Sequence, residues 1–417
     1  MNQKILSHII VDAITQALVK YQTPFYIYDA ASISKNVENF LHAFSWNKGF
    51  KEFFAVKALP NPYILKHLQK QGLGVDCSSL SELVLAQKCG FSGNDIMFTS
   101  NDTPIEDYKL ALELGAIINL DDITHIDFLS NNLYLPELLC FRYNPQQFKF
   151  ANSIIGDSKE SKFGLTHEQL LLAYKQAQKL GVKRFALHTM VASNELNKDC
   201  FIETARLTFS LAKQIKQALG ITLEFINLGG GLGIPYLPYE KPINIVEVAN
   251  GIKQVYLDNF GSDDSIGISM ENGRYITGPY GFLVTKVIHT KSTYKEYIGV
   301  DASMADLMRP GMYGAYHHIS ILGKDNNKNT HTYDVVGSLC ENNDKFAINR
   351  KLPEVDIGDV VIIHDAGAHA HSMGFNYNGK LRSAELLLTE NGNIKLVRRG
   401  ETLDDYFATL DFTGLDS

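Results

Sequence analysis

Several side chains with distinctive chemistry each follow a short apolar segment of the sequence. Lys57 ends FFAVK, Asp76 lies in GVDC, Arg142 in CFRYNP, His188 in ALHTM, and Glu271 opens ENGRYITG. A lysine amine can form a Schiff base with a carbonyl group, and a carboxylate or imidazole can hold and transfer protons. An ionised lysine at the end of a buried strand is costly unless it is paired. Taken alone, however, Lys57 is explained equally well as a surface residue whose stem packs on the protein.

A run of glycines follows another apolar segment. Gly229, Gly230 and Gly231 stand in NLGGGLGIP, with Gly233 close behind. The backbone N–H groups of such a run can cradle a phosphate. The pattern is not G-x-G-x-x-G, because Ile234 occupies the last position, so a dinucleotide-binding motif is not indicated. A flexible turn is the alternative interpretation of these glycines.

A lysine amine, a phosphate cradle and a carboxylate together describe a pyridoxal-phosphate site. Lys57 would hold the cofactor as a Schiff base, and Glu271 would keep the pyridine nitrogen protonated. A protonated ring accepts electrons from the carbanion that forms when carbon dioxide leaves. A racemase, which needs a weaker electron sink, can place a cation at the same position. Glu271 therefore favours decarboxylation and opposes an activity like that of alanine racemase.

The elements that must position these residues recur along the first two thirds of the chain. Strands are expected at residues 52–56, 74–77, 95–99, 116–120, 137–143, 184–190, 223–228 and 266–270. Helical stretches with recognisable cap signals separate them, such as Asn61-Pro62 and Thr103-Pro104. Strands that alternate with helices in this way predict a TIM barrel, in which chemistry lies at the carboxyl ends of the strands. A doubly wound open sheet is the alternative.

The pattern changes after Glu271. Strand-like segments follow at residues 282–289, 296–300, 331–336, 359–364, 384–388 and 394–397, and helical periodicity fades. These segments predict a mostly β second domain, which PFYIYD at 24–29 is expected to join. We therefore expect a barrel domain at 30–270 and a β-rich domain made of 1–29 and 271–417.

Composition narrows the class of protein. The net charge of -7 argues against a nucleic-acid binder, and no run of 18 apolar residues indicates a membrane span. The N-terminal segment is interrupted by polar residues, so it predicts an amphipathic helix and not a signal peptide. Five cysteines are scattered without a C-x-x-C pair. They suggest reduced thiols in the cytoplasm, with neither a disulfide framework nor a metal site.

The combined motifs resemble a known family. FFAVKALPNP, GVDCSSLSEL, SKFGL, NLGGGLGIPY, ENGR, LMRPGMYGAYH, CEN and DAGAHAHSMGFNYNGKLRSAEL are similar to the fold type III pyridoxal-phosphate decarboxylases, most closely the diaminopimelate decarboxylases. The resemblance extends from PFYIYD to RRGETLDDYFATL. It implies an α/β TIM barrel with a mostly β C-terminal domain and pyridoxal 5'-phosphate as cofactor. The implied reaction converts meso-2,6-diaminopimelate to L-lysine and carbon dioxide, the last step of lysine biosynthesis.

The same resemblance implies roles around the cofactor. Lys57 would carry the cofactor, and Glu271 would contact its pyridine nitrogen. The other implied cofactor contacts are Ser193, Gly229, Gly230, Gly231 and Tyr377 at the phosphate, and Asp76, Arg142 and His188 along the pocket.

It also implies roles around the substrate, in a head-to-tail homodimer with shared active sites. Arg274, Arg309 and Tyr313 would bind the distal carboxylate of the substrate. Cys340 and Glu341 would reach in from the other subunit, Cys340 to donate a proton to the carbanion and Glu341 to contact the distal ammonium. Residues 146–164, which include SKFG, would form a lid over the site. Taken alone, Arg309 is also explained by a structural ion pair and Cys340 by ordinary apolar burial.

This sequence departs from the family pattern at several positions. H-I-G-S after the sixth strand is here Met190-Val191-Ala192-Ser193, so the usual ring-stacking histidine is absent and Met190 is expected to stack in its place. The residue after Ser193 is Asn194. E-P-G-R is here E-N-G-R, with Asn272, and G-A-Y is G-A-H, with His369. None of these changes removes a group that bond cleavage requires.

Other functions stay open at this point. The same scaffold can decarboxylate lysine, ornithine or carboxynorspermidine, and a non-catalytic relative could bind the cofactor alone. Arg309 discriminates between the substrates, because a substrate without a distal carboxylate would leave that arginine unpaired, which is costly when buried. Intact Lys57, Glu271 and Cys340 argue against the non-catalytic alternative.

Overall fold

The computed structural model describes residues 4, 6–145, 160–262, 265–324 and 330–415. It forms two compact units. The first, which we call the sheet unit, comprises Met1–Ser32, Tyr236–Glu240 and Thr277–Ser417. The second, the barrel unit, comprises Ile33–Pro235 and Lys241–Ile276. The domain limits predicted from the sequence, a barrel domain at 30–270 and a β-rich domain made of 1–29 and 271–417, remain a proposal.

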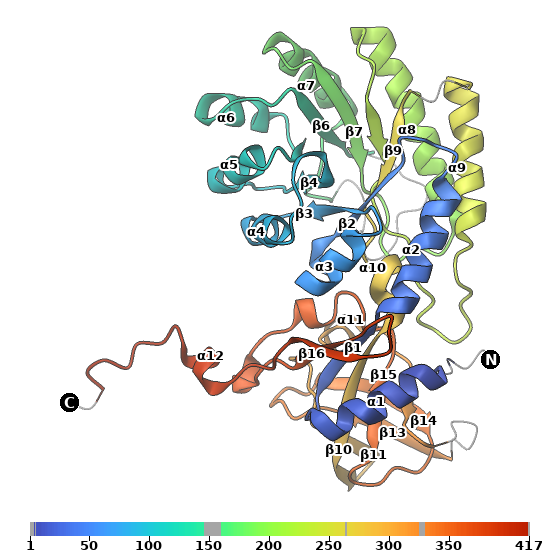
Figure 1. Ribbon diagram of the computed structural model, residues 1–417, viewed down its shortest axis with the longest axis vertical. Helices are drawn as coiled ribbons and strands as arrows, with labels where there is room; N and C mark the ends of the chain where they lie inside the picture. Colours follow the sequence, from blue (N-terminus) through green and yellow to red (C-terminus); the bar gives the residue numbers. More distant parts are fainter. Residues whose placement is uncertain (1–3, 5, 146–159, 263–264, 325–329, 416–417) are drawn as a thin grey trace. The chain divides into compact units, whose positions relative to one another are not determined.

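The barrel unit is built on parallel strands that close on themselves (Figure 1). The strands are β2 (Lys51–Ala55), β3 (Gly74–Cys77), β4 (Ile96–Thr99), β5 (Ile117–Leu120), β6 (Leu138–Tyr143), β7 (Arg184–Thr189), β8 (Phe225–Asn227) and β9 (Gly267–Met270). Each strand pairs with the next, and β9 pairs with β2 to complete the ring. The closed ring confirms the predicted TIM barrel and excludes the open sheet.

Helices connect these strands and begin at the expected kinds of residue. They are α2 (Ala30–Phe44), α3 (Pro62–Gln69), α4 (Leu80–Lys88), α5 (Ile105–Glu113), α6 (Thr124–Asn132), α7 (His167–Lys179), α8 (Lys198–Leu219) and α9 (Ile245–Phe260). Asn61 caps α3 by accepting from the Tyr63 amide, with Pro62 at the first helical position. The same pattern predicted for Thr103-Pro104 is wrong, because Pro104 itself is the N-cap of α5 and makes no side-chain cap bond.

The barrel interior is apolar below its carboxyl end. Side chains from six strands meet there, and the residue from the last of them is only partly buried: Phe53, Met97, Ile117, Leu138, Cys140, Ala186 and Phe225. Such a layer fills the barrel as a packed core. The polar residues that the sequence singled out therefore lie at or just after the strand ends.

The sheet unit contains a larger mixed sheet, with strand order β14-β13-β11-β10-β1-β16-β17 and with β15 pairing β10 and β12. The strands are β1 (Phe25–Asp29), β10 (Gly281–Ser292), β11 (Glu296–Val300), β12 (Ile319–Ile321), β13 (His331–Val336), β14 (Lys345–Leu352), β15 (Val360–Ile363), β16 (Ala384–Leu388) and β17 (Ile394–Arg398). β1 lies between β10 and β16, so the N-terminal segment PFYIYD forms part of this sheet. The sequence pattern had not predicted β12 and β14.

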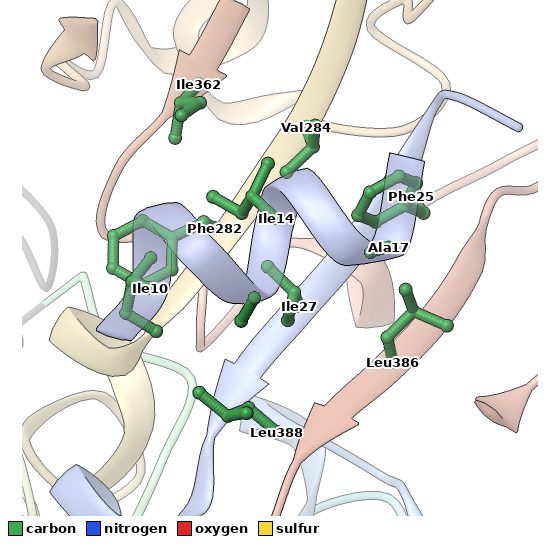
Figure 2. Packing of buried hydrophobic residues seen from close by; sticks show 11 residues of the cluster. Ile10, Ile14, Ala17, Phe25, Ile27, Phe282, Val284, Ile362, Leu386 and Leu388 are labelled. Atoms are coloured by element: carbon green, nitrogen blue, oxygen red, sulfur yellow. The ribbon is translucent and has the colours of Figure 1, made fainter. Parts of the chain in front are cut away.

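Helix α1 (His8–Lys20) packs on this sheet through one apolar stripe. Figure 2 shows Ile10, Ile14 and Ala17 of α1 facing Phe25 and Ile27 of β1. Further contacts come from the neighbouring strands through Phe282, Val284, Ile362, Leu386 and Leu388. The stripe recurs at helical spacing, which confirms the predicted amphipathic helix. Across the described part of the chain, no helix combines the length and the apolar character needed to cross a bilayer.

Candidate functional site at the carboxyl end of the barrel

Glu271 follows directly after β9 and has both carboxylate oxygens bonded. His188 Nε2 on β7 lies 3.0 Å from Oε2, and the Asn227 side-chain amide at the end of β8 donates to Oε1 at 2.7 Å. Burial would by itself raise the pKa of Glu271, but His188, Lys57 and the Asn227 hydrogen bond hold that pKa below its ordinary value. Glu271 is therefore an ionised carboxylate in a fixed orientation.

Asp76 on β3 is a second buried carboxylate, and it is poorly satisfied. Its Oδ1 atom has no hydrogen-bond partner among the described residues. Burial and the charge of Glu271 raise the pKa of Asp76 well above its ordinary value, against the opposing effects of Lys57 and Arg142. The His188 Nδ1 atom is likewise buried without a partner in the described part of the chain. Buried polar atoms are nearly always paired, so these two atoms indicate a place for polar groups of a ligand.

Lys57 lies just beyond β2, in the short 3-10 helix η1 (Val56–Ala58), and its side chain is exposed. Lys57 is therefore not a buried amine that would need a partner. Its charge instead lowers the pKa of Glu271 and acts in the same direction on Asp76 and Glu82. An accessible amine thus lies within the electrostatic reach of the carboxylates at the barrel end.

Arg142 near the end of β6 is held between a carboxylate and an aromatic ring. Its Nη1 atom lies 3.3 Å from Asp121 Oδ1, and its guanidinium lies 4.4 Å from the centroid of the Phe163 ring. Burial lowers the pKa of Arg142, and the charges of Asp121, Glu271 and Asp76 oppose that shift. Asp121, directly after β5, was not singled out in the sequence.

The glycine run lies against the neighbouring strand ends, and each glycine is required by space. A Cβ atom on Gly229 would collide with the Thr189 carbonyl, one on Gly230 with the Glu271 carbonyl, and one on Gly231 with the Ala192 carbonyl. Gly229 and Gly231 also have positive φ angles of 69° and 94°. This packing argues against an unconstrained flexible turn, because the loop is fitted to the ends of β7 and β9.

The amides of this loop show which donors a ligand could use. Gly229 donates to Asn227 Oδ1 at 2.9 Å, and Gly230 donates to the Met190 thioether sulfur at 3.2 Å. Thioether sulfur is a weak acceptor. Among the described residues, no hydrogen bond donated by the Gly231 amide is found. The loop therefore offers one unused donor and one weakly occupied donor to an anion such as a phosphate.

The remaining barrel residues of the predicted site lie beside this loop or after it. Ser193 is half-buried, and the neighbouring Asn194 accepts from the Ile234 amide at 3.0 Å through Oδ1. Arg274 is half-buried at the start of α10 (Arg274–Thr277). Of the predicted lid at 146–164, residues 146–159 lie outside the described residues.

Arg309 belongs to the sheet unit, where it begins α11 (Arg309–Tyr313) and is buried. Its Nη1 atom donates to the Tyr236 hydroxyl at 2.8 Å and lies 3.2 Å from His317 Nε2. The His317 Nδ1–H donates to the His364 carbonyl at 2.8 Å, which leaves Nε2 free to accept from the guanidinium. Arg309 is thus held at one nitrogen by two neutral acceptors.

Three of the other predicted residues of the sheet unit, Cys340, Glu341 and Tyr377, lie close to one another, and Tyr313 is exposed at the end of α11. Cys340 is exposed, and its amide donates to Asn378 Oδ1 at 2.7 Å, next to the exposed Tyr377. Tyr377 lies in the turn η6 (Tyr377–Gly379). Glu341, half-buried, accepts from the Asn343 amide at 3.0 Å. The structure therefore gathers the predicted residues into two sets, one in each unit.

Two features of the barrel unit fit pyridoxal phosphate. The glycine loop presents amide donors for a phosphate, and Asp76 and His188 present unsatisfied polar atoms beside the ionised Glu271. Lys57 offers an exposed amine in the same unit. Among the described residues, no group of three or more His, Cys, Asp or Glu side chains is arranged to hold a metal ion.

Several residues that shape both sets had not been predicted from the sequence. Asn227 bridges Glu271 and Gly229, and Tyr236 and His317 hold Arg309. All three stand inside the motifs that carried the family resemblance, at the ends of NLGGGLGIPY and LMRPGMYGAYH. The position of Asn227 at the end of β8 was a signal that could have found it. No local signal indicates that Tyr236 and His317, which lie 73 and 8 residues from Arg309 in the sequence, contact that arginine.

Known proteins are similar to this chain over most of its length. A protein named TabA from Pseudomonas amygdali pv. tabaci is 42% identical over 95% of this chain and 93% of its own length. The diaminopimelate decarboxylase of Methanothermobacter thermautotrophicus is 35% identical, over 93% of this chain and 91% of its own. A crystal structure of diaminopimelate decarboxylase from M. jannaschii matches with a TM-score of 0.90 and 31% identity, covering 97% of this chain and 95% of that one.

The family model for the pyridoxal-binding domain of the pyridoxal-dependent decarboxylases matches residues 30–278. That range contains Lys57, the glycine loop and Glu271, which are the residues whose geometry fits the cofactor. The match confirms the family that the motifs suggested and the cofactor that they implied. The chain belongs to the pyridoxal-dependent decarboxylases.

Proposed function

We propose that this protein converts meso-2,6-diaminopimelate to L-lysine and carbon dioxide with pyridoxal phosphate. The observation that carries the reaction type is Glu271, an ionised carboxylate fixed by His188 and Asn227 beside the glycine loop. A carboxylate in that state can keep a ring nitrogen protonated. The relatives named above as diaminopimelate decarboxylases support the choice of substrate.

In this proposal Lys57 binds the cofactor and Glu271 holds a proton on the pyridine nitrogen. The phosphate is bound by Gly229, Gly230, Gly231, Ser193 and Tyr377, and the pocket is lined by Asp76, Arg142 and His188. Bound there, pyridoxal phosphate supplies a protonated ring that accepts the electron pair left on Cα when carbon dioxide departs. The two unsatisfied atoms of Asp76 and His188 give it polar partners.

Substrate recognition is assigned to the residues of the sheet unit and to Arg274. Arg309, Arg274 and Tyr313 bind the distal carboxylate, for which a planar guanidinium is suited. Glu341 contacts the distal ammonium, and Cys340 donates a proton to Cα. The exposure of Cys340 supports its contact with another molecule. We propose that the protein is a homodimer in which both residues reach into the active site of the partner subunit. We also propose that it acts in the cytoplasm.

A related amino acid as substrate is the second candidate. The relative named TabA shares more identical residues with this chain than the Methanothermobacter decarboxylase does, 42% against 35%. Met190 and Asn272 further distinguish this chain from the family pattern. Lysine and ornithine are therefore the comparison substrates in the assay.

The test is kcat/KM for carbon dioxide release from meso-diaminopimelate, lysine and ornithine. A site built to bind a second carboxylate should reject lysine by about 10⁴-fold or more, because its own donors then stay unpaired. Arg309→Met should erase most of that preference by lowering activity on diaminopimelate. Equal wild-type values for lysine and diaminopimelate would contradict the proposed substrate and favour the second candidate.

The shared site is tested by mixing inactive variants. Lys57→Ala chains and Cys340→Ala chains should each be inactive, and a mixed dimer should contain one site with neither change. Recovered activity is the expected result. No recovery, in a mixture where mass spectrometry shows that subunits have exchanged, would assign both residues to the same subunit's site.

A further inference from the structure

Asn272 occupies a position where the resembling family has proline, and here it makes a set of bonds that proline could not make. Its amide N–H donates to Glu52 Oε1 at 2.6 Å, and its side-chain Nδ2 donates to Glu52 Oε2 at 3.2 Å. Its Oδ1 accepts from the Leu232 amide at 3.2 Å. Proline has neither the N–H nor a side-chain amide. Asn272 therefore links β2 to the glycine loop from a position directly after Glu271.

Glu52 is the buried partner in this arrangement. Glu52 lies on β2 and Asn272 lies after β9, and about one hundredth of the surface of each residue is exposed. Both Glu52 carboxylate oxygens receive hydrogen bonds from Asn272. Burial raises the pKa of Glu52 well above its ordinary value, and the two Asn272 donors oppose that shift. The pair is therefore mutually dependent, because each residue satisfies buried groups of the other.

The glycine loop also contacts Glu271, the residue directly before Asn272. The Glu271 amide donates to the Gly229 carbonyl at 2.9 Å, and a Cβ on Gly230 would collide with the Glu271 carbonyl. Beyond that contact, the Leu232 amide is held by the Asn272 side chain. Movement of Asn272 would therefore change the position of the glycine loop, of Glu271, or of both.

We propose that Asn272 and Glu52 are positioning residues for the cofactor: the pair fixes the glycine loop at a set distance from Glu271, so that one bound molecule can reach both. This inference rests on the proposed function, since it takes the loop as the phosphate site and Glu271 as the ring partner. It adds that cofactor affinity depends on a buried hydrogen-bond pair that touches neither the ring nor the phosphate.

The experiment reverses the hydrogen bond between the two side chains. Asn272→Asp sets two acceptors against each other, and Glu52→Gln sets two donors against each other. In the double variant the glutamine amide at position 52 donates to the carboxylate at position 272. That carboxylate still accepts from Leu232, and position 52 still accepts from the backbone N–H of 272. The dissociation constant of pyridoxal phosphate is measured by titrating each apoprotein, and the melting temperature of each apoprotein is measured in parallel.

Asn47→Ala is the matched control for structural damage. Asn47 is also buried and also makes two bonds to β9 and its flank, but at the amino end of the strand: it donates to the Ile266 carbonyl at 3.1 Å and accepts from the Ile268 amide at 3.2 Å. Its loss should lower the melting temperature without weakening cofactor binding.

The expected result is a dissociation constant raised about tenfold or more by Asn272→Asp, less by Glu52→Gln, and restored to within about threefold of wild type by the double variant. Weakening in the double variant equal to the product of the two single effects would overturn the inference. The inference would also be overturned if Asn47→Ala and Asn272→Asp lowered the melting temperature equally and also weakened pyridoxal-phosphate binding equally. If Asn272→Asp does not fold, Glu52→Gln and the double variant still decide the outcome. A wild-type protein that binds no pyridoxal phosphate would refute the proposed function itself, whereas normal binding by every variant would refute only this inference.

Discussion

The carboxyl end of the barrel and the cluster under α1 are both buried, yet they are built from opposite kinds of side chain. The barrel end holds Glu271, Asp76 and His188, and it leaves the Asp76 Oδ1 and His188 Nδ1 atoms without partners among the described residues. The α1 cluster is apolar throughout, and Ile14, Phe25 and Ile27 are fully buried (Figure 2). Unsatisfied polar atoms cost stability, whereas apolar burial contributes it.

This contrast shows that the carboxyl end of the barrel, and not the α1 cluster, contains buried groups that lower stability and can bind a ligand. Burial of a polar group without a partner persists only when the surrounding fold determines the position strongly. At the carboxyl end of the barrel, the surrounding strands fix the positions of Asp76 and His188. A ligand that satisfies these atoms should therefore stabilise the barrel unit, and changes to the α1 cluster should leave ligand binding intact.

The largest expected effect is at Lys57. Lys57→Ala should abolish turnover, because the proposed covalent attachment of the cofactor is lost. The glycine loop should retain some non-covalent affinity for pyridoxal phosphate. Borohydride reduction of the loaded wild-type protein followed by peptide mass spectrometry should find the cofactor on Lys57. Finding it on another lysine would remove Lys57 from the site.

Glu271→Gln should have the next largest effect. The amide cannot keep the ring nitrogen protonated, so kcat should fall by about 10²- to 10³-fold, or roughly 3 to 4 kcal/mol of barrier. The fold should persist, since the amide has nearly the same shape. Glu247→Gln on the exposed face of α9 serves as the control and should leave kcat unchanged. Near-normal turnover of the Glu271 variant would show that Glu271 is not the ring partner.

Ile14→Ala tests the apolar side of the comparison. Removal of this fully buried side chain should lower the free energy of unfolding of the sheet unit by about 2 to 5 kcal/mol. The dissociation constant of pyridoxal phosphate should stay the same, because most of the proposed cofactor contacts lie in the barrel unit. Ile9→Ala on the exposed side of the same helix should cost less than about 0.5 kcal/mol. Denaturant unfolding and cofactor titration measure the two quantities, and a loss of cofactor affinity would contradict the separation.

The smallest expected effect is a pH dependence in the sheet unit. Burial, with smaller contributions from Arg350 and Lys4, lowers the pKa of His318 to about 4. The unfolded chain binds this proton more readily than the folded protein does, so stability is complete above pH ~6.5 and is lost as the pH falls from there towards the folded pKa. Between pH 7.5 and pH 5 this group should cost about 2 kcal/mol of unfolding free energy.

His318→Gln should remove that part of the pH dependence while the other titrating groups remain. The measurement is the free energy of unfolding by denaturant at the two pH values for wild type and variant. An equal change with pH in both proteins would show that His318 does not titrate differently in the folded and unfolded states.

The local sequence determined the class of the fold and the chemistry of its most distinctive residues. Regular alternation of apolar segments and capped helices predicted the barrel, and the rule that barrel chemistry lies at the carboxyl ends of strands selected Lys57, Glu271 and the glycine run. These inferences depend on neighbours along the chain. They were less accurate where a local signal competes with another, as at Pro104, or where a strand is short and paired only through tertiary structure, as in β12.

Only the tertiary structure decided which side chains hold these residues in place. Asn227 reaches Glu271 across 44 residues, Tyr236 reaches Arg309 across 73, and Asn272 meets Glu52 across 220. The last pair exists because β9 closes the barrel against β2, an event that no local window of sequence contains. The exposure of Lys57 was decided in the same way, since this residue lies in the 3-10 turn that follows β2 and its side chain is exposed there. Residue types along the chain determine what chemistry is available, and strand closure determines which of those residues can act on the same ligand.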